Sequence, residues 1–271
     1  MIKRAVLALT LSVGAAQADD AALMDFFETQ ACGIGPSSRA NAVAAGFDLK
    51  TIGTWEKHLL VVGEARMDGG WIVLSPEFCT IRLPDFDSPF AMDGPVVAAA
   101  IGAVDEYAAP SDITGSSFPG CYLDGEKIQD ALVDQGDVTA AYLRFVAAGL
   151  GSGDLRFYSE NILETPPGFQ VTRGMGCDSV PNIGALQESH DVLLARLDEF
   201  VRAVGPLNAC DDSYWPNNGT DVYDVIAPFY DSQTNAHFTI EILFMAMAAG
   251  WIEGAGDAGR GTPRPPLCTY E

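Results

Sequence analysis

The stretch VVGEARMDGGWIVLSPEFC, Val61 to Cys79, contains the end of a helix, a hairpin and a cysteine in one short run. Gly63 is placed to end the helix, because glycine tolerates the left-handed conformation that follows a last helical turn. Asp68-Gly69-Gly70 then predicts a tight turn into a strand from Trp71 to Leu74. This order of helix, glycine, hairpin and cysteine is the pattern from which we predict the fold.

Two later stretches follow the same plan. FVAAGLGSGD, from Phe145, leads to Cys177, and MAMAAGWIEGAGD, from Met245, leads to Cys268. When the chain is aligned on Gly63, Gly149 and Gly250, each taken as the end of an apolar helix, the three stretches fall into one frame. Recurrence in one frame predicts a supersecondary unit that occurs three times.

The six cysteines fit this frame, with one before and one after each glycine. The cysteine count alone leaves the pairing open. The frame predicts three disulfides, one inside each unit: Cys32 with Cys79, Cys121 with Cys177, and Cys210 with Cys268.

Apolar residues at helical spacing precede each of the three glycines. Asp48 is placed to cap the first of these helices. The stripes are Ile52, Trp55, Leu59 and Leu60 in the first unit, Val138, Tyr142, Phe145 and Val146 in the second, and Ile240, Leu243, Phe244, Met247 and Trp251 in the third.

A further helix is expected before the first cysteine of each unit. The ranges are 21–30, 95–108 and a long helix from about Leu186 that ends at Gly205-Pro206, because proline blocks continuation. The second unit also offers strands at 155–158 and 169–172. The run GAGDAGRGTPRPPLC replaces the hairpin of the third unit, so its strands are in doubt.

The outline of two helices and a two-stranded hairpin resembles a winged-helix unit, with the glycines at the end of the helix before the wing. We therefore predict an α+β, mainly helical protein of three diverged winged-helix-like units, each with an internal disulfide. The expected divisions are a signal peptide at 1–18 and units at 19–83, 95–178 and 182–271. The packing between the units is left open, as one compact body or as separate beads.

The N-terminus predicts export. Lys3 and Arg4 precede an apolar run and Ala16-Gln17-Ala18, as in a secretory signal with a small-residue cleavage site. Cleavage there would place the protein in the periplasm or outside the cell, where disulfides persist. Later apolar stretches lack the length and purity of a membrane-spanning helix, so no membrane insertion is expected after cleavage.

The chain is strongly acidic. Its formal net charge is −22, and loss of Lys3 and Arg4 with the signal would make it −24. Such a charge repels nucleic acid, so DNA binding is not expected despite the winged-helix resemblance. Hydrophobic residues make up 48%, which is enough for a packed core.

No familiar catalytic motif is present. The histidines, His58, His190 and His237, are not at metal-ligand spacing, and no zinc-protease, serine-hydrolase, phosphate-loop or dinucleotide pattern occurs. All cysteines are accounted for by the expected disulfides. We therefore assign no catalytic, cofactor-binding or metal-binding residue.

Two weaker signals remain open. Acidic loops could bind Ca²⁺ or be solvated turns, although neither has EF-hand spacing. Clustered aromatic residues could form a contact surface or part of the core. The acidic groups are Asp85, Asp87 and Asp93, and Asp211, Asp212, Asn217, Asn218 and Asp221; the aromatic group is Tyr214, Trp215, Tyr223, Phe229 and Tyr230.

These patterns favour a non-catalytic binding protein of the cell envelope, with an envelope or extracellular protein as its partner. Repeated small units create extended surfaces rather than one deep cleft. The alternative is an exported hydrolase that uses an Asp/Glu pair, possibly on a glycan, because such a pair leaves no linear motif. That alternative requires two convergent carboxylates in a groove.

Overall fold

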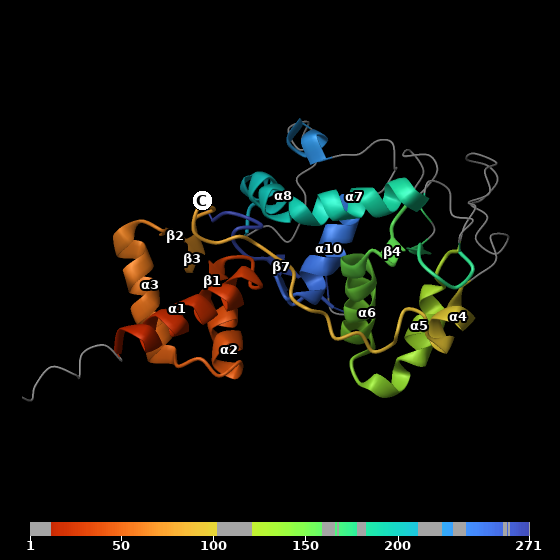
Figure 1. The fold of residues 1–271 in the computed structure, drawn as a ribbon, viewed down its shortest axis with the longest axis horizontal. Helices are drawn as coiled ribbons and strands as arrows, with labels where there is room; N and C mark the ends of the chain where they lie inside the picture. Colours follow the sequence, from red (N-terminus) through yellow and green to blue (C-terminus); the bar gives the residue numbers. More distant parts are fainter. Residues whose placement is uncertain are drawn as a thin grey trace, which may run out of the picture.

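The computed structural model describes residues 12–101, 121–158, 166, 168–177, 183–210, 224–229, 237–256, 259 and 261–270. These residues form a mixture of α-helices and short antiparallel strands (Figure 1). The strands of the described part make one three-stranded sheet and two two-stranded ladders. The mixed α and β class expected from the sequence is therefore present.

The part of the chain expected to be the first unit (19–83, called the first unit below, as for the other two expected units) alternates helices with the strands of the three-stranded sheet. Its antiparallel sheet has the order β1-β3-β2, so β2 lies at an edge. Asp48 caps α3 as expected, because its carboxylate accepts a hydrogen bond from Thr51 N at 2.8 Å. The elements are α1 (Ser12–Glu28), β1 (Gly33–Ile34), α2 (Pro36–Ala44), α3 (Leu49–Val62), β2 (Ala65–Asp68) and β3 (Trp71–Leu74).

The second unit has a similar order of elements. Tyr122 pairs with Gln170 of β5, on the side of β5 opposite to β4, so its strands are arranged as in the first unit. The elements are α4 (Pro95–Ala100), α5 (Gly125–Ala131), the 3-10 turn η2 (Val133–Gln135), α6 (Val138–Ser152), β4 (Leu155–Arg156) and β5 (Gln170–Val171).

The glycine frame expected for this second unit was wrong by one helical turn. Gly149 lies inside α6, and the left-handed glycine that ends the helix is Gly153, with φ of 74°. Position 149 has no room for a larger side chain. A Cβ there would lie 2.1 Å from Met92 Cε and 2.6 Å from the Leu155 side chain. Gly63, Gly153 and Gly250 each have a positive φ and lie two residues before a strand.

The third unit departs most from expectation. The single long helix predicted to end at Gly205 is broken at Arg196, whose φ of −111° is not helical. The doubtful strands are present as a short ladder. The elements are α7 (Ile183–Ala195), α8 (Leu197–Val204), the 3-10 turns η3 (Gly205–Leu207) and η4 (Ala227–Phe229), α10 (Phe238–Ala248), β6 (Ile252–Glu253) and β7 (Thr262–Pro263).

Three disulfides brace the chain and use all six cysteines. They join Cys32 to Cys79, Cys121 to Cys177 and Cys210 to Cys268. Each bond links a residue next to the first strand or bridge of a unit to the segment that follows its last strand.

The buried side chains form one continuous hydrophobic cluster that extends through all three units. Helices α6 and α10 pack side by side at its centre (Figure 1). The predicted stripe of α10 was wrong in part: Leu243, Phe244 and Met247 are only half-buried, and the most buried residues include Glu241 and Met245. This helix is packed on most of its circumference, so its apolar residues do not mark one face.

Helix α1 runs through the expected cleavage site at Ala18 without a break. Its buried residues Leu23 and Phe27 follow that site. Within the described ranges, none of the helices combines the length and the apolar character that crossing a bilayer requires.

Candidate functional site

A groove of about 360 Å³ lies where the first unit meets the third. Its walls come from β2 and β3, the turn after β3, α8, and the chain that follows β7. The hydrogen bond from Tyr270 N to Asp68 at the end of β2 places the last described residues against the first unit. The groove is mainly apolar, with walls that include Ala65, Val73, Leu74, Pro76, Pro206 and Pro266.

Two arginines also line the groove, and each donates a hydrogen bond to an aspartate. Arg202 of α8 donates to Asp198 at 2.8 Å and to the carbonyl oxygens of Leu74 and Cys79 at 3.0 and 2.7 Å. Asp198 in turn accepts a hydrogen bond from Ile81 N at 2.8 Å. Arg202 therefore fastens α8 to the end of the first unit and fixes one wall of the groove.

Arg66 is the more accessible of the two. It donates to Asp68 Oδ2 at 2.9 Å, and its side chain is 59% exposed. The other oxygen of the buried Asp68 accepts a hydrogen bond from Tyr270 N at 2.8 Å. Asp68 thus joins the hairpin of the first unit to the end of the chain.

The C-terminal segment that closes the groove is anchored by a buried arginine. Arg264 donates to Gln30 O at 3.1 Å, and its guanidinium lies 5.5 Å from the centre of the Trp71 ring. Burial lowers the pKa of Arg264 to about 10, opposed by the nearby Glu253 carboxylate, so the guanidinium stays charged at neutral pH. Glu253 also accepts a hydrogen bond from the Ser37 hydroxyl.

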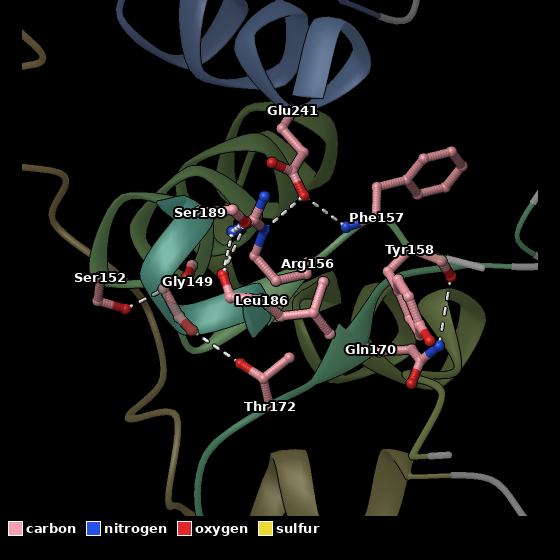
Figure 2. Close-up of polar contacts among 11 residues, drawn as sticks. Gly149, Ser152, Arg156, Phe157, Tyr158, Gln170, Thr172, Leu186, Ser189 and Glu241 are labelled. Carbon is pink, nitrogen blue, oxygen red and sulfur yellow. Dashed lines mark hydrogen bonds and ion pairs between the residues drawn. The ribbon is translucent and has the colours of Figure 1, made fainter. Parts of the chain in front are cut away.

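A second polar cluster lies in the core between the second and third units. Figure 2 shows Glu241 of α10 directed at Arg156 of β4. One Glu241 oxygen accepts from Arg156 Nε and from Phe157 N, both at 2.8 Å, and Arg156 also donates to Leu186 O at 2.7 Å. The side chains of Arg156 and Glu241 are each only 2% exposed. These hydrogen bonds link β4 to α7 and α10 within the core.

His190 of α7 lies beside this cluster. Burial lowers the pKa of His190, the Arg156 guanidinium lowers it further, and the Glu241 carboxylate raises it in part. The imidazole packs against Gly153, where a Cβ would lie 2.8 Å from His190 Cδ2. The burial, the lowered pKa and the contact with Gly153 all favour the neutral imidazole as a packing residue.

The other histidines are separate from His190. His58 is exposed on α3, whereas His237 is half-buried and its ring meets that of Phe157 edge to face, with centroids 5.7 Å apart. Among the described residues, no group of three His, Cys, Asp or Glu side chains is placed to hold a metal ion.

The described members of the acidic and aromatic groups singled out from the sequence do not line the groove. Asp85, Asp87 and Asp93 are exposed. Phe229 packs on Phe200 with centroids 5.4 Å apart. The remaining members lie outside the described residues: Asp211, Asp212, Tyr214, Trp215, Asn217, Asn218, Asp221, Tyr223 and Tyr230.

The sequence alone does not reveal the groove. Its lining comes from four segments separated by up to about two hundred residues, and the arginines that shape it have no motif. Ser-Pro at 75–76, Gly-Pro at 205–206 and Pro-Pro at 265–266 are visible in the sequence, but nothing local indicates that they meet.

Comparison of the chain with family models, with characterised proteins and with solved structures finds no match. Function must therefore be inferred from the groove and from the residues that form it.

Proposed function

We propose that this chain is an exported, disulfide-braced, non-catalytic binding protein of the cell envelope, built from three diverged winged-helix-like units. Its three disulfides are consistent with an extracytoplasmic location, because such bonds persist in oxidising compartments. The similar order of helices, strands and disulfide in the first two units supports the repeat.

The observation that carries the proposal is the groove between the first and third units. Proline and aliphatic residues form its walls, and no Asp or Glu is among the described residues that line it. This lining favours binding of an apolar side chain and offers no pair of carboxylates for hydrolysis. The partner we propose is another envelope protein that inserts an apolar side chain into the groove.

Cross-linking in the native host tests this proposal. A photoreactive residue at Pro76, on the groove, should give one discrete adduct with an envelope protein identifiable by mass spectrometry. The same residue at Val192, which is 55% exposed on α7 and outside the groove lining, is the positional control.

A blocking variant makes the test specific. Ser75→Trp should fill the groove and abolish the adduct, because Ser75 is part of the lining, whereas Thr80→Trp on the exposed surface nearby should leave the adduct intact. If Pro76 and Val192 cross-link equally, or if the adduct survives Ser75→Trp, the groove is not the binding site.

A further inference from the structure

Strand β2 presents an open edge. In the hairpin, Ser75 N donates to Glu64 O at 2.9 Å, while Leu74 N is turned the other way and donates to Cys32 O at 3.0 Å. Because antiparallel strands alternate between bonded and non-bonded pairs, the backbone groups of Ala65 and Met67 point away from β3. Within the described part of the chain, no strand pairs with that side of β2.

Exposed apolar side chains occur in β2 and at the end of the helix just before it. Met67 is 56% exposed, and Val61 and Val62, just before the strand, are 85% and 48% exposed. Gly63 lies between these valines and the strand, and no atom is within 4 Å of the position that a Cβ would take there. An edge strand with apolar neighbours is a template for pairing with another strand.

The charges of the strand select the partner. An antiparallel pair of identical strands is self-complementary about a two-fold axis, so a second copy can supply the missing strand. When the pairing is centred on Ala65, Glu64 of each copy lies opposite Arg66 of the other copy, which gives two pairs of opposite charge. Both residues are accessible, Glu64 partly and Arg66 largely.

The other two registers are disfavoured by charge. Pairing of Ala65 with Met67 places Arg66 opposite Arg66, and like charges directly opposite destabilise a sheet. Pairing centred on Met67 places Arg66 opposite Asp68, which is buried and already bonded through both oxygens to Arg66 and Tyr270.

We propose that two copies of this chain pair antiparallel through β2, centred on Ala65, and join their three-stranded sheets into one. In this register Met67 of each copy faces the open space at Gly63 and covers the exposed valines before it. Ala65 and Arg66 also line the groove, but Ser75 and Pro76, where the cross-linking variants lie, take no part in the pairing.

Sedimentation of the mature protein at about 0.15 M ionic strength, where charges are screened beyond about 8 Å, measures the association directly. We expect a concentration-dependent monomer and dimer equilibrium. Glu64→Arg and Arg66→Glu should each weaken the dimer by about tenfold, because each creates two like-charge pairs. The double variant should restore it, because the pairs are re-formed in reverse.

Control variants separate pairing from net charge and from folding. Glu77→Arg and Lys57→Glu make the same charge changes at exposed positions outside β2 and should leave the dimer unchanged. Thermal unfolding of Glu64→Arg, Glu77→Arg and Lys57→Glu should match the parent, whereas variants with Arg66→Glu also lose the ion pair to the buried Asp68 and should unfold at a lower temperature. A protein that stays monomeric up to millimolar concentration, or a double variant that fails to recover, would overturn the proposal without affecting the cross-linking result at the groove.

Discussion

Glu241 shows how far a single side chain can depart from the pattern around it. It lies in the apolar run FTIEILFMAMA, yet it is one of the most buried residues of α10. Burial of a carboxylate is costly unless a charge and hydrogen bonds compensate it. Arg156 and the Phe157 amide provide that compensation, so the charge becomes a link between α10 and β4.

The first prediction concerns this pair. Glu241→Leu should reduce the free energy of unfolding by about 3–5 kcal/mol, because it leaves the Arg156 guanidinium buried without a counter-charge. Adding Arg156→Met should recover most of the loss, since apolar replacement of both partners removes the unpaired charge. Urea denaturation measures both.

Glu199→Gln is the matched control for this measurement. Glu199 pairs with Arg196 at 3.0 Å but is 61% exposed, so its loss should change stability by no more than about 0.5 kcal/mol. If Glu241→Leu with Arg156→Met is as unstable as Glu241→Leu alone, the ion pair with Arg156 is not the reason why Glu241 stabilises the fold.

The second prediction concerns His190 and pH. The pKa of His190 is lowered in the folded state. As pH falls below about 6.5, His190 is therefore protonated in the unfolded chain before it is protonated in the folded protein. The folded state should therefore lose stability as pH falls from 7 toward the lowered pKa. His190→Gln should flatten this part of the curve of urea midpoint against pH.

His58→Gln is the control for the pH measurement, because His58 is exposed on α3. This variant should keep the pH dependence of the parent between pH 7 and 5. If the urea midpoint of His190→Gln depends on pH as strongly as that of the parent, other groups cause the loss of stability at low pH.

At the scale of elements, the segment after β7 decides how the units meet. It passes so close to α8 and β1 that the glycines there have no room for a side chain. A Cβ at Gly205 would lie 1.8 Å from Pro266 O, and one at Gly33 would lie 2.4 Å from Pro265 O. These glycines allow the terminal segment to lie against the first sheet, where Arg264 and Tyr270 bind it.

The third prediction follows from this close approach. Gly205→Ala should destabilise the protein by about 1–3 kcal/mol, because the added methyl group forces the terminal segment away. Gly53→Ala is the matched control: no atom lies within 4 Å of its Cβ position in α3, so it should be neutral or stabilise by about 0.5–1 kcal/mol. Thermal and urea unfolding test both, and equal effects would exclude the contact as the cause.

At the scale of the whole molecule, hydrogen bonds and an ion pair join the three expected units to one another. Trp251 Nε1 of the third unit donates to Thr29 O of the first at 2.8 Å. Arg202 joins the same two units, and Arg156 with Glu241 joins the second to the third. The first and second units are therefore each joined to the third by polar contacts, in addition to the continuous cluster of buried apolar side chains.

The fourth prediction is that the described units unfold together. Chains of this length often unfold in steps, but a shared core should couple the units into one transition. Scanning calorimetry should give a calorimetric enthalpy close to the van't Hoff value, with coincident loss of far- and near-ultraviolet circular dichroism. Separate transitions would show that each unit is stable alone.

Local features of the chain were predictable because short-range physics decides them. The Asp48 cap, the end of α3 at Gly63 and strand β3 from Trp71 to Leu74 occur where their residues predict. The three disulfides join the same cysteine pairs that the expected frame predicts. The predicted end of α6 at Gly149 was wrong because Gly149 and Gly153 are both plausible helix ends in the sequence. Only the contacts of Gly149 with Met92 and Leu155 distinguish the two glycines.

By itself, the sequence determined the order of helices and hairpins, the disulfide frame and the acidic charge, since capping, turn chemistry and composition act within a few residues of one another. Only the tertiary structure decided the burial of Glu241, the docking of the C-terminal segment, the groove and the open edge of β2. Those features depend on groups far apart in the chain, and their energies exist only once the three units have packed together.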